Sequence, residues 1–139
     1  MAAKDLIHDA VRTALEKDKW AITHEHMKIE FEDAYVNVDL GAEKLLVAER
    51  AHEKIAVEVK SFIGRSAIQD IEEALGQFVV YRIFLRRVEP ERHLFVGISH
   101  TTFDTIFQSK AIQVLVEELN VSLVVVNTDI EEVLLWMRR

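Results

Sequence analysis

Residues 55–62 read IAVEVKSF, and six of these eight residues suit a buried β-strand. The two exceptions, Glu58 and Lys60, are ionisable and lie two positions apart. Side chains alternate between the two faces of a strand. The two sets are Ile55, Val57 and Val59 on one face, and Ala56, Glu58 and Lys60 on the other. Glu58 and Lys60 therefore share a face, which is either a solvated surface with an ion pair worth about 0–1 kcal/mol or a functional site.

The composition indicates a single globular domain over residues 1–139. Half of the residues are hydrophobic, which is enough for one substantial core in a chain of this length. The sequence has no apolar run of about 18 residues, no N-terminal signal peptide and no cysteine. These features predict a soluble, cytoplasmic protein with no membrane partner and no thiolate chemistry.

The net charge of −7 argues against a protein that coats nucleic acid through bulk positive charge. It leaves room for a nucleic-acid enzyme with a local basic rim, because metal ions neutralise acidic clusters at such sites. The net charge therefore argues against a protein that coats nucleic acid, but it is compatible with a nucleic-acid enzyme.

The residues before the opening stretch predict a helix followed by strands. An amphipathic pattern covers residues 4–18, and strand patterns cover residues 20–31 and 34–42. Residues 43–50 fit either a continuing strand or a short helix. A strand over residues 54–62 then makes a hairpin with what precedes it.

The residues after the opening stretch predict alternating helices and strands. Ser66 has the character of an N-cap, and a long helix is expected after it, over residues 66–87. Beyond it come a strand at 93–99, a helix at 101–120, an apolar strand at 121–127 and a short helix or turn at 129–139. The expected interior residues of these last two helical segments are Phe103, Phe107, Ala111, Val114 and Leu115, and then Leu134, Leu135 and Trp136.

These elements give the order αβββαβ, followed by a further helix, a strand and a tail. Three antiparallel strands and a βαβ crossover predict an α/β fold in which helices flank both faces of a mixed central sheet.

Asp39, in the segment VNVDLGA, adds a second carboxylate next to the predicted hairpin. Two carboxylates supply the hard oxygen ligands that Mg²⁺ prefers. A bound metal lowers the pKa of a water molecule and offsets charge that builds on phosphorus. A lysine beside it steadies the attacking hydroxide or the phosphoryl oxygens. Asp39, Glu58 and Lys60 together therefore suit phosphodiester hydrolysis, whereas the alternative is a structural ion network.

The pattern D…ExK on this element order resembles the PD-(D/E)XK nuclease superfamily, which has a restriction-endonuclease-like core. VDLGA carries its first part, with Val38 in place of the proline, and EVK at residues 58–60 carries the second. In ALGQFVVYR, Gln77 and Tyr81 match the QxxxY motif of the RecB-like branch. That branch also places a metal-binding histidine on its N-terminal helix, and His8 is the candidate here.

The resemblance implies a site with Mg²⁺ or Mn²⁺ as cofactor. Its implied metal ligands are Asp39, Glu58, the backbone carbonyl of Val59 and His8. Its implied catalytic residues are Asp39, Glu58, Lys60 and Gln77, where Gln77 holds water, Lys60 or a phosphate. Gln77 is the polar residue in a half-buried row that otherwise consists of Ala74, Tyr81 and Phe84, which makes it a better candidate for a site than for a surface amide. For His8, a core-edge histidine bonded to backbone is an equal alternative.

A basic cluster extends along the same helix. Arg82 and Arg86 follow Tyr81, and Arg65 precedes the helix. These residues could follow the path of a bound DNA backbone. They fit equally well a solvated helix end, where positive charge favours the C-terminus.

Longer blocks of the sequence are similar to the XisH family of fdxN element excision controlling factors. These blocks are KDLIHDAV, DKWAITHE, DLGAEKLLVAER, KIAVEVKSF and EALGQFVVYR. The resemblance implies a role in programmed excision of a DNA element, with DNA, a XisI-type companion and a site-specific recombinase as partners. A homodimer is also compatible with the sequence.

Two hypotheses about function follow. In the first, the protein is a Mg²⁺-dependent, endonuclease-like enzyme acting on DNA phosphodiesters. In the second, it keeps the nuclease fold as a regulatory module that binds DNA or a protein partner without cutting. The net charge of −7 and the control role of the family favour the second.

Overall fold

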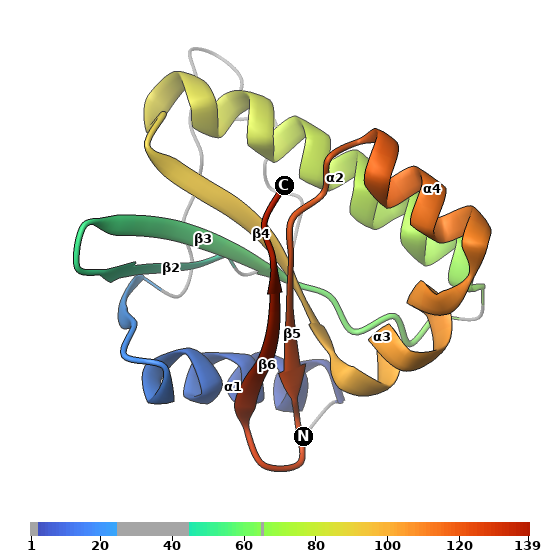
Figure 1. Cartoon of the computed structure of the whole chain (residues 1–139), viewed down its shortest axis with the longest axis horizontal. Coiled ribbons are helices and arrows are strands. Elements are labelled where there is room, and N and C mark those ends of the chain that lie inside the picture. The colour runs from blue at the N-terminus through green and yellow to red at the C-terminus, as the bar shows by residue number, and fades with distance from the viewer. Residues whose placement is uncertain (1–2, 25–44, 65) are drawn as a thin grey trace.

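The computed structural model describes residues 3–24, 45–64 and 66–139, so the predictions for residues 25–44 and for Arg65 lie outside the described residues (Figure 1). In chain order the elements are α1 (Ala3–Lys17), β1 (Ala21–His24), β2 (Leu45–Arg50), β3 (Glu53–Val59), α2 (Ala67–Val88), β4 (Arg92–Ser99), α3 (His100–Thr105), the 3-10 helix η1 (Ile106–Gln108), α4 (Lys110–Glu118), β5 (Leu123–Asn127) and β6 (Glu132–Met137). The described strands form one six-stranded sheet in the order β1-β2-β3-β4-β5-β6. β3, β4 and β5 are parallel, and the other neighbours pair antiparallel.

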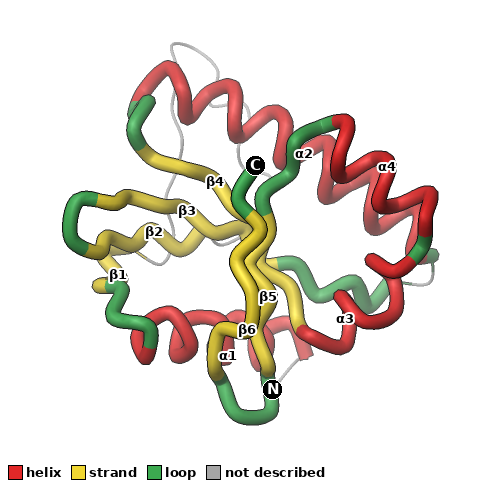
Figure 2. The backbone as a smooth tube through the Cα atoms, in the orientation of Figure 1, coloured by secondary structure: helices red, strands yellow, loops and turns green. Residues whose placement is uncertain are grey.

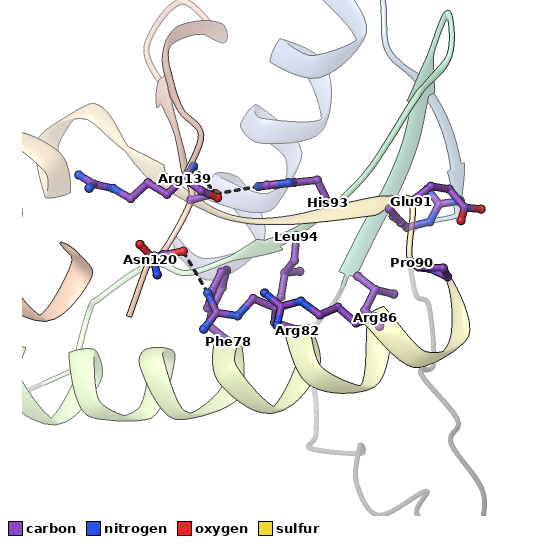
Figure 3. A pocket seen from close by; sticks show the side chains of 12 residues that line it. Phe78, Arg82, Arg86, Pro90, Glu91, His93, Leu94, Asn120 and Arg139 are labelled. Carbon is purple, nitrogen blue, oxygen red and sulfur yellow. Dashed lines mark hydrogen bonds between the residues drawn. The ribbon is translucent and has the colours of Figure 1, made fainter. Parts of the chain in front are cut away.

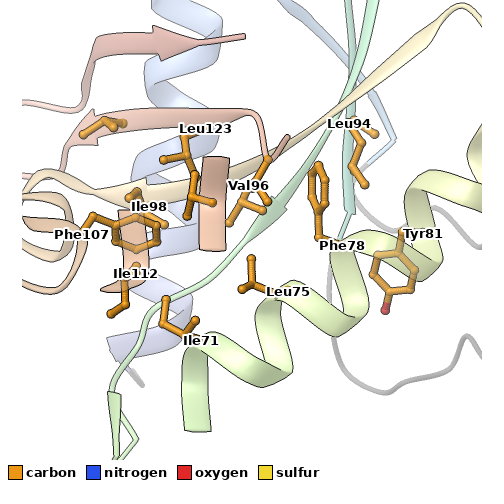
Figure 4. Packing of buried hydrophobic residues seen from close by; sticks show 14 of the residues in the cluster. Ile71, Leu75, Phe78, Tyr81, Leu94, Val96, Ile98, Phe107, Ile112 and Leu123 are labelled. Carbon is orange, nitrogen blue, oxygen red and sulfur yellow. The ribbon is translucent and has the colours of Figure 1, made fainter. Parts of the chain in front are cut away.

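Helices cover both faces of this mixed sheet (Figure 2). α1 packs on one face through Val11, Ala14 and Leu15. On the other face, α2, η1 and α4 enclose a second apolar cluster, in which Phe78 lies close to the sheet (Figure 4). The predicted fold class, with its αβββαβ core and flanked mixed sheet, is confirmed. None of the helices in the described ranges is long and apolar enough to cross a membrane.

β3 occupies a central position and divides its side chains between the two faces. Ile55 and Val57 are fully buried in the cluster under α1, and Ala56 is fully buried in the cluster under α2. Val59 is partly buried against the first cluster. The alternation expected of this stretch is therefore present, and Glu58 shares the face that α2 covers.

Within the ambiguous segment at residues 43–50, the described part, Leu45–Arg50, is the strand β2. It pairs antiparallel with β3 in the predicted hairpin, with Leu45 opposite Glu58 and Arg50 opposite Glu53. The partner of the Glu58 strand is therefore this segment, while the predicted strand at 34–42 lies outside the described residues.

α2 begins as expected. The side chain of Ser66 accepts a hydrogen bond from the backbone amide of Gln69, which satisfies one of the orphan donors of the first turn. Ile71, Leu75 and Phe78 follow at helical spacing and are buried against the sheet. This packing fixes the rotation of the helix, and so decides which side chains reach Glu58 and Lys60.

The single helix expected at 101–120 is wrong. Ser109 has an extended backbone (φ −66, ψ 128) that ends η1 and starts α4 in a new rotation. Phe107 is buried as expected. After the break the buried residues are Ile112 and Val116, whereas the expected interior residues Ala111, Val114 and Leu115 are exposed.

The short helix or turn expected at 129–139 is also wrong. This segment forms β6, which pairs antiparallel with β5 from Asn127↔Glu132 to Leu123↔Met137. Leu134 and Leu135, expected to pack, are 55% and 39% exposed. Trp136 is partly buried and packs edge-to-face on Phe95, with ring centroids 5.0 Å apart.

Candidate functional site

Glu58, Lys60 and Gln77 come together on the α2 face of the sheet. The backbone amide of Lys60 donates to the carbonyl of Gly97 at 3.0 Å, which continues the β3–β4 pairing and keeps the Lys60 side chain on the Glu58 face. Lys60 Nζ lies 3.6 Å from Glu58 Oε1 and donates a hydrogen bond to Gln77 Oε1. Gln77 therefore reaches this pair from α2, as the sequence predicted.

The ion pair is not a solvated surface pair. The side chains of Glu58 and Lys60 are 0% and 11% exposed. Removing two charges from water costs several kcal/mol for each ion, and only good partners offset that cost. A pair in this position, beside a cavity, is of the kind found at functional sites.

A cavity of about 240 Å³ opens next to Lys60, between the end of β3 and the first turns of α2. Lys60, Asp70 and Glu73 supply the charged groups of its lining. Asp70 also accepts a hydrogen bond from the backbone amide of Gly64 at 2.9 Å, which ties the connecting loop to the helix. A substrate group entering this cavity would meet the ammonium of Lys60 and two carboxylates.

Sequence reasoning missed Asp70 and Glu73. With Gln77 they follow one another at spacings of three and four, so they lie along one face of α2. Once Gln77 is assigned to the site, that spacing is the signal that could have included them.

The loop that closes the cavity is anchored by Phe62. Its backbone is left-handed, with a φ of 52, which is costly for an aromatic residue. Its ring packs edge-to-face on Phe107, with centroids 5.6 Å apart, and this contact helps to offset the strain. The conformation directs residues 63 and 64 back toward Asp70.

The predicted metal ligands are only partly within the described residues. Glu58 supplies a buried carboxylate, and Asp39 lies outside the described residues. His8 is 6% exposed on α1, the helix that covers the opposite face from α2. Among the described residues, no group of three or more His, Cys, Asp or Glu side chains could hold a metal ion. The carboxylate of Glu58 and the carbonyl of Val59 are oxygen donors of the type Mg²⁺ takes, so the site fits this ion only if Asp39 completes it.

The predicted DNA-contacting residues are not gathered in one place. Tyr81 is 4% exposed and belongs to the apolar cluster under α2. Arg82 and Arg86 line a different and larger cavity, of about 520 Å³ (Figure 3). A helix turns by about 100° per residue, so Arg82 lies about 140° around α2 from Gln77. Arg65 lies outside the described residues.

His93 lines this larger cavity, where its surroundings favour the neutral imidazole over the protonated one. Burial lowers the pKa of His93, and the positive charges of Arg138, Arg82 and Arg86 lower it further. His93 Nε2 lies 2.8 Å from Ser122 Oγ, in a hydrogen bond that the neutral ring can make.

We expect this depressed pKa to make the stability of the fold depend on pH. Below the usual histidine pKa of about 6.5, the unfolded chain binds a proton that the folded chain resists, so the free energy of unfolding falls as pH falls. A His93→Gln variant should lose stability less steeply between about pH 6.5 and pH 5. Urea denaturation at a series of pH values measures both slopes, and identical slopes would contradict the expectation.

Comparisons with known proteins place the chain next to one family. The sequence model of the XisH family, described as XisH protein, matches residues 1–134. A crystal structure of an XisH family protein from Nostoc punctiforme PCC 73102 is 40% identical, with a TM-score of 0.88, and the match covers 96% of this chain and 100% of that one. A crystal structure of an fdxN element excision controlling factor protein from Anabaena variabilis is also 40% identical, with a TM-score of 0.87 and coverage of 96% and 99%. A search of curated proteins finds no match.

Proposed function

The chain belongs to the XisH family, and from that membership we propose that it takes part in controlling the excision of a DNA element. The relative from Anabaena variabilis is an fdxN element excision controlling factor protein, which supports this role. We further propose that the protein is a Mg²⁺-dependent, endonuclease-like enzyme acting on DNA phosphodiesters. DNA, a XisI-type companion and a site-specific recombinase are its proposed partners.

One observation carries the nuclease proposal. A fully buried carboxylate and a lysine share one face of a central strand, and a glutamine from the next helix holds the lysine. A purely structural role gives little reason to bury such a pair beside a cavity, because apolar residues of similar volume are often as stable. The cavity next to Lys60 gives a phosphodiester a place to bind.

The residues would divide the work of hydrolysis. Glu58 and Asp39, with the carbonyl of Val59, would hold Mg²⁺, which lowers the pKa of bound water and offsets negative charge on phosphorus. Glu58 and Gln77 fix the ammonium of Lys60 at the cavity wall, where it orients a water molecule toward phosphorus. The water oxygen forms the new bond to phosphorus, the ester P–O bond breaks, and a proton passes to the leaving oxygen. Placing Lys60 before substrate arrives removes an entropic cost from this step.

We expect Mg²⁺ to raise the melting temperature of the wild-type protein and to support nicking of supercoiled DNA. At a hundred times its Kd, a ligand stabilises the folded state by about 2.7 kcal/mol. Asp39→Asn and Glu58→Gln should each abolish both effects. Glu118→Gln, which changes an exposed acid of α4 that lines neither cavity, is the matched control and should retain both. A Mg²⁺-linked gain that survives Asp39→Asn and Glu58→Gln would refute this site.

The alternative is a regulatory module that binds without cutting. The complete burial of the Glu58 carboxylate favours it, because metal binding there needs the carboxylate to be reached. The same variants separate the two functions. A complex with a XisI-type protein that Glu58→Gln forms as tightly as wild type, with nicking by neither, would support the binding module.

A further inference from the structure

The larger cavity is separate from the Lys60 site. Arg92 and His93, at the start of β4, lie in its lining, whereas Lys60 follows Val59 at the other end of the strand pair. His93 lies four positions before Gly97, the register partner of Val59, which is about 13 Å of strand. The two cavities therefore lie toward opposite ends of the parallel strands and on opposite flanks of α2.

The lining of this cavity carries an excess of positive charge. Two charged residues of the lining are already paired with residues outside it. Arg92 binds Glu89, with Nε 2.9 Å from Oε2, and the carboxylate of Glu91 lies 3.8 Å from Lys54 Nζ. The guanidinium groups of Arg82 and Arg86 complete the charged lining, whereas Arg139 meets the cavity through its backbone and its side chain extends away from them (Figure 3). Across the described part of the chain, neither Arg82 nor Arg86 has a carboxylate within 4.0 Å.

Arg82 is held in place before any ligand arrives. Its Nη1 donates to the backbone carbonyls of Leu119 at 2.7 Å and Asn120 at 3.0 Å, and its guanidinium lies 4.9 Å from the centre of the Phe78 ring. Figure 3 shows Arg82 and Arg86 side by side on α2, facing the strand that carries His93. Burial lowers the pKa of Arg82, and the neighbouring charge of Arg86 lowers it further.

The opposite rim is also organised. Ser122 Oγ lies 2.8 Å from His93 Nε2 and accepts a hydrogen bond from the backbone amide of Arg139 at 2.9 Å. This contact brings the backbone of Arg139 to the cavity wall. The lining thus joins α2, the start of β4, the residues just before β5 and Arg139, two residues after β6, around one positive space.

We propose that this cavity binds a phosphate group. Its volume of about 520 Å³ lies in the range of small-molecule sites. Guanidinium groups bind tetrahedral oxyanions through paired N–H donors, and the two neighbouring guanidinium groups of Arg82 and Arg86 match the charge of a phosphate better than that of a single carboxylate. The group belongs either to a free phosphate compound or to the backbone of DNA. The proposal does not depend on the nuclease function.

The test is calorimetric titration of the full chain with inorganic phosphate at constant ionic strength. Arg86→Gln is the first variant, because no hydrogen bond or ion pair within the described residues ties its side chain to the fold, and Arg82→Gln is the second. Each should weaken binding about tenfold, since a charge-assisted contact is worth at least that factor. Arg87→Gln, which changes the next arginine of the same helix outside the cavity, is the matched control and should bind like wild type.

An NMR titration gives a second readout that a general loss of stability would not produce. Bound phosphate should raise the pKa of His93, because an anion favours the charged imidazole, and Arg86→Gln should reduce that rise. No phosphate binding by the wild-type protein, or equal weakening by Arg86→Gln and Arg87→Gln, would overturn the proposal.

A short duplex DNA distinguishes the two sources of phosphate. If the phosphate belongs to DNA, Arg86→Gln should weaken duplex binding and inorganic phosphate should compete with the duplex. If it belongs to a free compound, duplex affinity should be the same for Arg86→Gln and Arg87→Gln while phosphate binding still differs. Either pattern supports the site. Glu58→Gln should leave phosphate binding unchanged, so a failure of the nuclease proposal would not mimic a failure of this one.

Discussion

Replacing Lys60 with methionine is expected to lower the free energy of unfolding by about 3–5 kcal/mol, the usual cost of removing one partner from a buried ion pair. The variant keeps a similar volume but leaves the Glu58 carboxylate, which is 0% exposed, without the cation now 3.6 Å away. It also removes the donor to Gln77. Urea denaturation of the purified variant measures the loss.

Two controls separate the buried charge from the loss of a lysine side chain. Lys54→Met changes a lysine of the same strand whose ion pair with Glu91 is exposed, so it should cost about 0–1 kcal/mol. The double variant Lys60→Met with Glu58→Gln should be more stable than the sum of the two single changes predicts, because no lone charge is left buried. Additive losses would show that Glu58 and Lys60 do not act as a pair.

The sequence was most informative where local periodicity and burial agree. On β3, the alternation of apolar and ionisable residues fixed both faces, and the apolar stripe of α2 fixed its rotation against the sheet. Gln77 could be assigned to the site because its helix face and the Lys60 strand face are each set by such a pattern.

The helix expected at 101–120 failed because the break has no strong local signal. No Pro or Gly lies within the segment, and Ser109 is tolerated inside helices as well as at their starts. The break is set by packing: it lets Phe107 before it and Ile112 and Val116 after it enter the same cluster. An unbroken helix would present a different stripe.

β6 failed for a related reason. A regular edge strand shows strict alternation, but the pairing of β5 with β6 shifts register between Val125 and Val126. The shift breaks the period-two pattern, and the run VLLWM then fits a helix equally well. The segment becomes a strand because it forms hydrogen bonds with β5, and a partner so provided cannot be read from the sequence of the segment alone.

The cationic cavity escaped sequence reasoning because its parts are far apart in the chain. Arg82 and Arg86 looked like one row with Tyr81, yet Tyr81 turns into the core. Arg139 joins them only because β6 brings the end of the chain back beside Ser122. A cavity built from α2, β4 and both ends of the β5–β6 hairpin has no local pattern to reveal it.

Replacing Arg92 with methionine is expected to lower the free energy of unfolding by about 3–5 kcal/mol. The guanidinium is 5% exposed and makes a 2.9 Å ion pair with Glu89. It also donates to the carbonyls of Ala48 and Ile55, which are register partners in the β2–β3 hairpin. Arg92 thus joins the hairpin to the turn between α2 and β4, and its loss removes the ion pair with Glu89 and two hydrogen bonds to backbone carbonyls.

Arg138→Met is the matched control for this clamp, because Arg138 makes an equally short ion pair, 2.8 Å from Glu53, with side chains about half exposed. Solvent screens such a pair, so its loss should cost only about 0–1 kcal/mol. Urea denaturation of both variants under one condition compares them directly. Equal losses would mean that burial does not set the strength of these two arginine–glutamate pairs. A large loss confined to Arg92→Met would place the clamp among the contacts that hold β2 and β3 in register, and with them the strand that carries Glu58.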